Sequence, residues 1–490
     1  MTREPATTLA HDERGTILVL WGILLGVVLG FVALSFDLGR ASITRSELQS
    51  FADSVALAAA GELDGNPDSI TRATNVAALI LDQQSFGNTD RSLQGAVDYT
   101  LTYFRSLPTP AANQTVPNDL SPMTDVTTDP ARAAYVRVAV TPTVVESTFG
   151  AAFAALTGQQ NRDYTLGAEA VAGLSILACD ITPMFFCLPQ GTPFRADDNI
   201  GTMIQMRRGG PQAGWQPGNF GFLDPRGGLE VDPTGPCRNE SGANLLQCLL
   251  GAVDNITQCF DQRGVLTDPG QSNGLMNTVF NIRFDIYTGN MRNARSDPNY
   301  APAPNVIKGR AAASGGNGNG GGGNSNACNP PTVTTSAALP RDTVLINDPT
   351  RRFGDGVWSR TNYVNLNYGG TDPHPGATTR YRYYLDELAR AGTGRILAAP
   401  RLETGRPSCS TVPPAGPDRR IITVAGIDCS ANGFNGRATV PVREFFKIFL
   451  TEPITEDDAI YGEIIGSASE AGTGAVGTGG IVRDVVQLYR

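Results

Sequence analysis

The most hydrophobic stretch of the chain runs from Thr16 to Phe36 and contains no charged residue. Its 21 residues would form a helix about 31 Å long, which matches the hydrocarbon core of a lipid bilayer. No other segment of the sequence has a comparable run of apolar residues. The pattern therefore predicts a single transmembrane helix near the N-terminus.

A cleaved signal peptide is the alternative interpretation, because Arg3 and Arg14 precede the apolar run. However, the run is longer than the hydrophobic part of a usual signal peptide. The small-residue strings that a signal peptidase would need are also badly placed, since residues 33–35 lie inside the run and residues 39–41 follow Asp37. We therefore expect an anchor that stays in the membrane.

The helical pattern continues beyond the predicted span. Apolar residues recur at steps of three, four or seven, at Leu34, Leu38, Ala41, Leu48, Ala52, Val55 and Ala59. This spacing predicts one helix from about Thr16 to Glu62, ended by the turn sequence at residues 63–67. Its second half, a stalk, would pack through Leu48, Ala52, Val55 and Ala59 on the protein's own sheet or on a partner's helix. Within the span, Gly22, Gly26 and Gly30 form a stripe suited to helix packing in lipid.

The rest of the chain predicts a mixture of helices and strands, so the fold class is α+β. A helix is expected in residues 67–85 and a short one at 151–156. Alternating or apolar runs predict strands at 96–106, 134–146, 164–174, 421–427, 445–450, 460–465 and 481–489. Residues 313–327 consist of Gly, Asn, Ser and Ala and predict a flexible linker.

Composition excludes several classes of function. The net charge is −9 and only Lys308 and Lys447 are lysines, so we expect no nucleic-acid partner. The sequence has two histidines, His11 and His374, which leaves little for a histidine-based active site or metal centre. We expect no cofactor, no resident metal and no enzymatic activity.

Eight cysteines follow the span and none precedes it. They are Cys179, Cys187, Cys237, Cys248, Cys259, Cys328, Cys409 and Cys429. An even number without a C-x-x-C pair favours disulfides in an oxidising compartment, which places the N-terminal tail in the cytoplasm. Eight cysteines allow 105 connectivities. Cys179–Cys187 and Cys409–Cys429 are close enough in sequence for local pairs, which leaves two bridges among the other four cysteines.

Two short strings imitate functional motifs. Residues 270–274 satisfy G-x-S-x-G, but a turn sequence precedes them where a nucleophile elbow needs a buried strand. Residues 64–68 imitate the start of an EF-hand loop, whose sixth and twelfth positions here are Ser69 and Asn75 instead of Gly and Glu. We expect an ordinary turn at each place. Calcium binding by other Asp/Asn loops, such as 347–349 or 355–356, is not specified by the sequence.

Three segments resemble a known family. Residues 13–15 (ERG), residues 36–40 (FDLGR) and residues 48–60 (LQSFADSVALAAA) resemble, in order and spacing, the TadE/TadG-like proteins of the tight-adherence (Flp) pilus assembly system. The resemblance implies a membrane helix that continues into a pseudopilin-like domain. Processed pilin-like members carry a Glu five residues after the cleavage glycine. Leu20 stands at that position counted from Gly15, which indicates the unprocessed, TadG-like type.

The resemblance and the patterns together give a domain organisation. We expect a cytoplasmic tail (1–15), a transmembrane helix (16–36), a periplasmic stalk helix (37–66) and a pseudopilin-like α+β domain (67–175). A cysteine-containing region (176–312), the linker (313–327) and a β-rich C-terminal region (328–490) would follow. Disulfides would cross-link the exported regions.

The resemblance implies a non-enzymatic envelope protein that takes part in assembly or anchoring of Flp pili. It would be a single-pass protein of the bacterial inner membrane with most of its chain in the periplasm. Its partners would be other pilus assembly proteins, and its helix could mediate an oligomer. The alternative is a membrane-tethered periplasmic or surface binding protein or hydrolase that is unrelated to pili.

Overall fold

The computed structural model divides the chain into two compact units. Unit 1 comprises residues 1–175 and 485–490, and unit 2 comprises residues 176–484. The structure describes residues 14–84, 91–108, 120, 123–130, 132–158, 160, 163–179, 181–189, 194–208, 215–224, 235–253, 259–262, 264–268, 275–311, 328–329, 338–390, 396–397, 403–432, 437–454, 459–468 and 482–489. The predicted tail up to residue 13 and the predicted linker 313–327 lie outside these residues.

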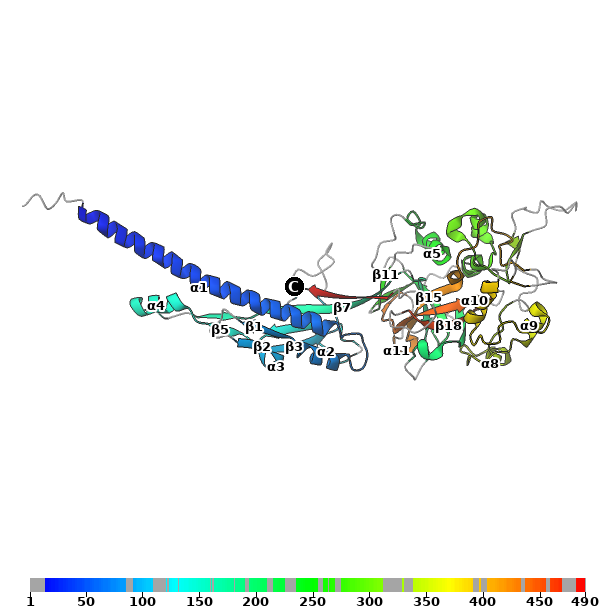
Figure 1. Ribbon diagram of the computed structural model, residues 1–490, viewed down its shortest axis with the longest axis horizontal. Helices are drawn as coiled ribbons and strands as arrows, with labels where there is room; N and C mark the ends of the chain where they lie inside the picture. Colours follow the sequence, from blue (N-terminus) through cyan, green and yellow to red (C-terminus); the bar gives the residue numbers. More distant parts are fainter. Residues whose placement is uncertain are drawn as a thin grey trace, which may run out of the picture. The chain divides into compact units, whose positions relative to one another are not determined.

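Unit 1 is built on one long helix, α1 (Arg14–Ala60), which is drawn in blue in Figure 1. The predicted continuous helix is therefore present, and it ends two residues before the predicted Glu62. The other elements of unit 1 are α2 (Ser69–Ala77), β1 (Leu81–Gln84), β2 (Arg91–Gln94), α3 (Gly95–Asp98), β3 (Tyr99–Phe104), β4 (Tyr135–Val140), β5 (Thr143–Val145), α4 (Thr148–Thr157), β6 (Tyr164–Leu166) and β7 (Glu169–Cys179).

The sheet of unit 1 has β4 at its centre. Strands β3 and β7 pair antiparallel with β4 on either side, and the C-terminal strand β19 (Val482–Tyr489) pairs with β7. The helix α1 packs against β4, and two antiparallel ribbons, β1–β2 and β5–β6, flank this core. The chain thus brings its C-terminus back to the sheet of unit 1.

Unit 2 contains a closed barrel of six strands. Their order is β9, β10, β8, β15, β17 and β18, and β18 pairs with β9 to close the ring. The strands are β8 (Met184–Cys187), β9 (Met203–Arg208), β10 (Asn219–Leu223), β15 (Ile421–Ile427), β17 (Glu444–Leu450) and β18 (Ile460–Ser467). The β8–β15 and β9–β10 pairs are parallel, and the other pairs in the ring are antiparallel.

The first and last parts of β10 use the same edge for different partners. Asn219 and Phe220 pair with β9, whereas Phe222 and Leu223 pair with β12 (Val265–Asp268). Beyond the barrel, β12 also pairs with β16 (Thr439–Val440). The remaining strand pairs are β11 (Cys259–Asp261) with the end of β7, and β13 (Arg310–Ala311) with β14 (Cys328–Asn329).

Apolar side chains fill the barrel and the space between it and the surrounding helices. Barrel residues such as Phe186, Met206 and Phe446 are fully buried in the same cluster as Leu250 of α5 and Val279 of α6. The helices of unit 2 are η1 (Asp197–Asn199), α5 (Gly242–Gly251), α6 (Leu275–Phe280), η2 (Asn281–Phe284), η3 (Gly289–Ser296), η4 (Pro298–Tyr300), α8 (Thr343–Asn347), α9 (Thr361–Tyr368), α10 (Arg380–Arg390), η6 (Pro417–Arg420) and α11 (Cys429–Asn432).

The fold class predicted from the sequence is confirmed, with local corrections. The helix expected in residues 67–85 ends at Ala77, and residues 81–84 form the strand β1 instead. The strand expected at 164–174 is two strands, β6 and β7, and β7 continues to Cys179. The closed barrel was not predicted.

Candidate functional site

The first half of α1 carries a long apolar surface. Its large side chains are exposed at Ile17, Leu18, Val19, Leu20, Trp21, Ile23, Leu24, Leu25, Val27, Val28, Leu29, Phe31, Val32, Leu34 and Phe36. An 18-residue window has a mean hydropathy of 2.8, and none of that window is buried inside the protein. By length and composition this half of the helix can cross a membrane.

The glycine stripe lies on this exposed half. A side chain added at Gly22, Gly26 or Gly30 would meet no atom within 4 Å, so the described part of the chain supplies no packing partner for the stripe. The expected role of these glycines in packing between helices therefore remains a prediction.

The second half of α1 is packed inside unit 1. The four side chains Leu48, Ala52, Val55 and Ala59 have no exposed surface, and neither do Phe51 and Ala56. The ring of Phe51 lies 5.9 Å from the ring of Tyr99 at the start of β3. Of the two alternatives left open by the sequence, the structure places this face on the protein's own sheet.

Asp37 lies one residue beyond the apolar run, between the two halves of α1, and its side chain binds the start of α4. Its carboxylate is buried and accepts hydrogen bonds from the Ser147 hydroxyl at 2.8 Å and from the backbone N–H groups of Phe149 and Gly150 at 3.0 and 2.9 Å. The Thr148 N–H donates to the same carboxylate at 3.2 Å. An anionic side chain from another helix thus caps the N-terminus of α4.

The sequence analysis noted Asp37 within the FDLGR segment and missed its role. Two signals were present: a charged residue at the end of an apolar run, and a Ser-Thr pair at the start of a short apolar helix. Because 110 residues separate Asp37 from Ser147, nothing local in the sequence links them.

The EF-hand-like segment is a turn held by an arginine. The Arg72 guanidinium forms ion pairs with Glu62 at 2.8 Å, with Asp64 at 2.6 Å and with Asp68. These carboxylates are therefore directed at a side-chain cation. No group of His, Cys, Asp and Glu residues suited to hold a metal ion occurs among the residues that the structure describes.

All eight cysteines form disulfides, and the predicted local pairs are wrong. The bridges are Cys179–Cys259, Cys187–Cys429, Cys237–Cys248 and Cys328–Cys409. Cys179 lies opposite Cys259 on paired strands, and Cys187 ends β8 beside the end of β15, which leads into α11. These two bridges join neighbouring strands from distant parts of the chain, whereas Cys237 and Cys248 pair across 11 residues, so closeness in sequence alone did not identify the partners.

His374 lies among tyrosines. Its ring contacts the rings of Tyr383 and Tyr368 edge-on, with centroids 5.1 and 6.3 Å away. Its backbone N–H donates to Asp372, and burial lowers the pKa of its imidazole. The G-x-S-x-G string at 270–274 lies outside the described residues, so its expected turn remains a prediction.

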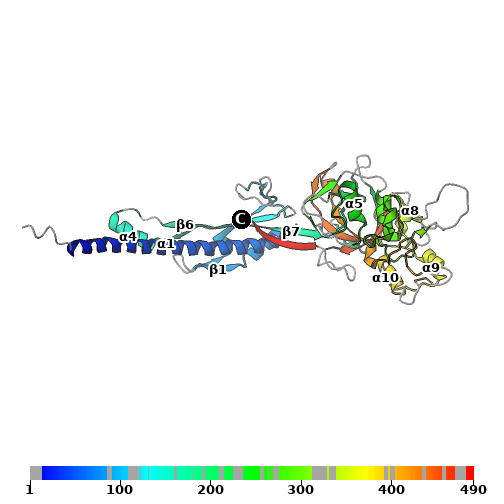
Figure 2. The same cartoon turned by 90° about the horizontal axis from the view of Figure 1, so that it is seen from above.

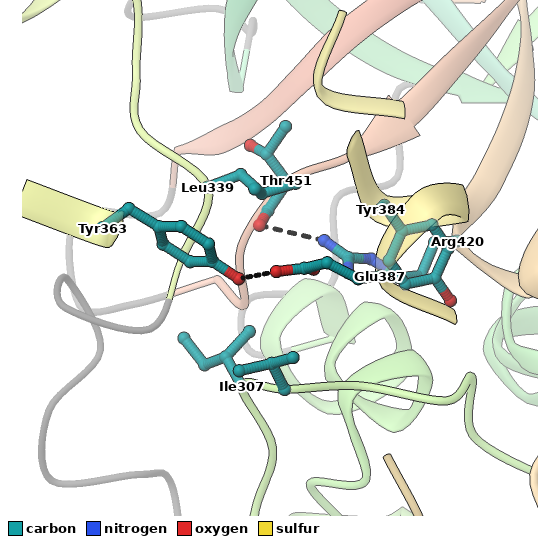
Figure 3. A pocket seen from close by; sticks show the side chains of 8 residues that line it. Ile307, Leu339, Tyr363, Tyr384, Glu387, Arg420 and Thr451 are labelled. Carbon is teal, nitrogen blue, oxygen red and sulfur yellow. Dashed lines mark hydrogen bonds between the residues drawn. The ribbon is translucent and has the colours of Figure 1, made fainter. Parts of the chain in front are cut away.

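A small cavity in unit 2 is lined by a buried polar cluster, shown in Figure 3. The Glu387 carboxylate accepts hydrogen bonds from the hydroxyls of Tyr363 at 2.6 Å and Tyr368 at 2.7 Å. The Arg420 guanidinium donates to the carbonyl oxygens of Leu450 and Thr451. The cavity measures about 10 Å³, room for one water molecule, which is too small for a substrate.

Glu387 should make the stability of the protein depend on pH. Burial raises the pKa of Glu387 to about 7 against 4.5 for the ordinary side chain, although the two tyrosine hydroxyls lower it in part. The unfolded chain therefore releases this proton first as pH rises. The folded state consequently loses about 3 kcal/mol of relative stability between pH 4.5 and pH 7.

We expect Glu387→Gln to remove this loss, because the amide stays neutral. The free energy of unfolding of the variant minus that of wild type should therefore rise by about 2 kcal/mol when the pH is raised from about 5 to about 8. Urea unfolding of the full-length protein in detergent at both pH values measures the difference. Tyr363→Phe, which removes a donor to the carboxylate, should act in the opposite direction at pH 8. A variant-to-wild-type difference that does not change with pH would contradict the assignment.

A comparison with protein families addresses the N-terminal segment directly. Residues 15–62 match the family model Tad, described as "Putative Flp pilus-assembly TadE/G-like". The N-terminal helix is Tad-like. The match covers nearly all of α1 and the start of the turn after it, and it confirms the resemblance seen in the sequence. No curated protein and no solved structure matches the chain.

Proposed function

We propose that this protein is a non-enzymatic, membrane-anchored component of Flp pilus assembly. The observation that carries the proposal is that one helix, within the Tad-like segment, is apolar and exposed in its first half and packed on a sheet in its second. A helix of this kind holds a folded unit at a membrane while leaving that unit outside the lipid.

The disulfides support the orientation that we propose. All four bridges lie in unit 2, on the C-terminal side of the apolar run. Disulfides persist in oxidising compartments such as the bacterial periplasm. The N-terminal tail would then be cytoplasmic, and unit 2 together with the folded part of unit 1 that follows the span would be periplasmic.

The proposal of a structural role rests on what fills unit 2. Two of its buried arginines hold the fold: Arg380 between Asp342 and Glu463, and Arg419 on the carbonyl oxygens of Ala252 and Ala301. The cavity beside Glu387 is the size of one water molecule. The two histidines of the sequence supply little for acid–base chemistry.

Deletion of the gene tests the role in pilus assembly. We expect the deletion strain to lose pili and surface adherence, and a plasmid copy of the full-length gene to restore both. A second copy, in which residues 1–36 are replaced by a cleavable signal peptide, should export both units without an anchor and fail to restore pili. Electron microscopy counts the pili, and fractionation locates the protein. Normal pili and adherence in the deletion strain would overturn the proposal.

A further inference from the structure

The connection between β5 and β6 (residues 146–163) contains a helix without a charged residue. β5 and β6 pair antiparallel from Thr143–Leu166 to Val145–Tyr164, and α4 lies between them. The sequence of α4 is TFGAAFAALT, in which Phe149 is 42% exposed and Ala152 and Ala155 are also exposed. An apolar helix with exposed aromatic and aliphatic surface is unusual in water.

The position of α4 along α1 explains this surface. Figures 1 and 2 both show α4 beside the N-terminal half of α1, the half that is exposed and apolar. The ring of Phe149 packs edge-on against the ring of Phe36, with centroids 5.6 Å apart. Phe36 is the last residue of the uncharged run, so α4 begins at the level where the span ends.

The start of α4 has the hydrogen bonding that a lipid environment demands. In hydrocarbon, backbone N–H groups that lack a partner cost several kcal/mol each, and the first turn of a helix always has such groups. Here the N–H groups of Thr148, Phe149 and Gly150 all donate to Asp37. The Arg40 guanidinium also donates to the Thr148 hydroxyl at 2.6 Å. The two ends of the connection between β5 and β6 meet beside Asp37, where Asp163 accepts a hydrogen bond from the backbone N–H of Ser147.

We propose that α4 is a second membrane contact: it enters the leaflet next to the unit 1 sheet, beside the span, and Asp37 holds it at that depth. This inference rests on the membrane anchoring in the proposed function. The ten residues of α4 measure about 15 Å, half of the hydrocarbon thickness, so the helix stays within one leaflet.

Photochemical capture of phospholipid tests this placement. A photoreactive phenylalanine analogue replaces Phe149, Leu29 or Leu79, one at a time, in the full-length protein in its native membrane. Leu29 lies in the span, and Leu79 is 76% exposed after α2, far along the chain from α4. After irradiation, mass spectrometry of the purified protein detects phospholipid adducts. We expect adducts at positions 29 and 149 and none above background at position 79.

The outcomes separate this inference from the proposed function. Adducts at position 29 without any at 149, or a protein adduct in place of lipid at 149, overturn the inference and leave the anchor intact. No adduct at either position overturns the anchor itself. Asp37→Ala should lower lipid capture at position 149 about fivefold, the usual effect of losing a cap, and leave position 29 unchanged. Asp53→Ala, further along the same helix, is the matched control. Equal capture at position 149 in both variants would overturn the role assigned to Asp37.

Discussion

Replacing Arg380 by Met should destabilise unit 2 by about 3–5 kcal/mol, the cost of leaving buried charges without their counterion. Arg380 has no exposed surface and forms ion pairs with Asp342 and, at 3.0 Å, with Glu463, which are equally buried. Its guanidinium also donates to the carbonyl oxygens of Pro340 and Gly201. These contacts join α10 to β18 and to the segments before α8 and β9, so that one side chain holds four parts of the chain.

Urea unfolding of the full-length protein in detergent measures this effect. Trp358 is a suitable reporter, because the Arg380 guanidinium lies 4.7 Å from the centre of its ring. The matched control is Arg382→Met on the same helix, since Arg382 is 58% exposed and pairs with Asp386 one turn away. The control should cost less than about 1 kcal/mol, as exposed ion pairs do. Similar losses in the two variants would show that the buried network does not carry the stability that we assign to it.

The second large effect is expected from the bridge between Cys187 and Cys429. It closes a loop of 242 residues and ties the end of β8 to α11. Cross-linking restricts the unfolded chain more when the loop is longer, which gives about 5 kcal/mol for a loop of this length in the chain-entropy account. We therefore expect the double variant Cys187→Ala, Cys429→Ala to unfold at a much lower urea concentration.

The bridge between Cys237 and Cys248 is the internal control. Cys237 precedes α5 and Cys248, 11 residues later, lies within it. The same account assigns this bridge about 3 kcal/mol. Its double alanine variant should therefore lose less stability than the variant that lacks the long-range bridge. Equal midpoints for the two variants would indicate that packing around each sulfur pair, and not loop length, decides the cost.

The parts of the fold that were predictable from the sequence are those set by neighbouring residues. The bounds of α1 follow from a repeat of apolar positions that continues without a proline to Ala60. Strands β4, β15 and β17 stand out as local runs of alternating or apolar residues. The barrel does not stand out, because its strands pair positions such as Phe185 and Ala425, which no local pattern connects.

The same distinction applies to the candidate site. The span and the packed face of the stalk were recognised because each is a helical pattern within one segment. The cap that Asp37 provides for α4 and the long-range pairing of Cys187 with Cys429 were missed, because each depends on two segments that meet only in the folded chain. The Glu387 cluster was missed for the same reason, since its tyrosine donors come from α9 and the carboxylate from α10.

The topology of the barrel has a consequence for export of the chain. In the periplasmic orientation that we propose, β8, β9 and β10 would leave the membrane well before their barrel partners β15, β17 and β18, which begin only after residue 420. Until then one edge of β8 lacks its parallel partner β15, and Cys187 lacks its disulfide partner Cys429. During this interval Cys179, eight residues before Cys187, would already be outside in that orientation and available for a wrong bridge. Folding of this protein should therefore depend on a periplasmic disulfide isomerase, and its yield should fall in a strain that lacks one.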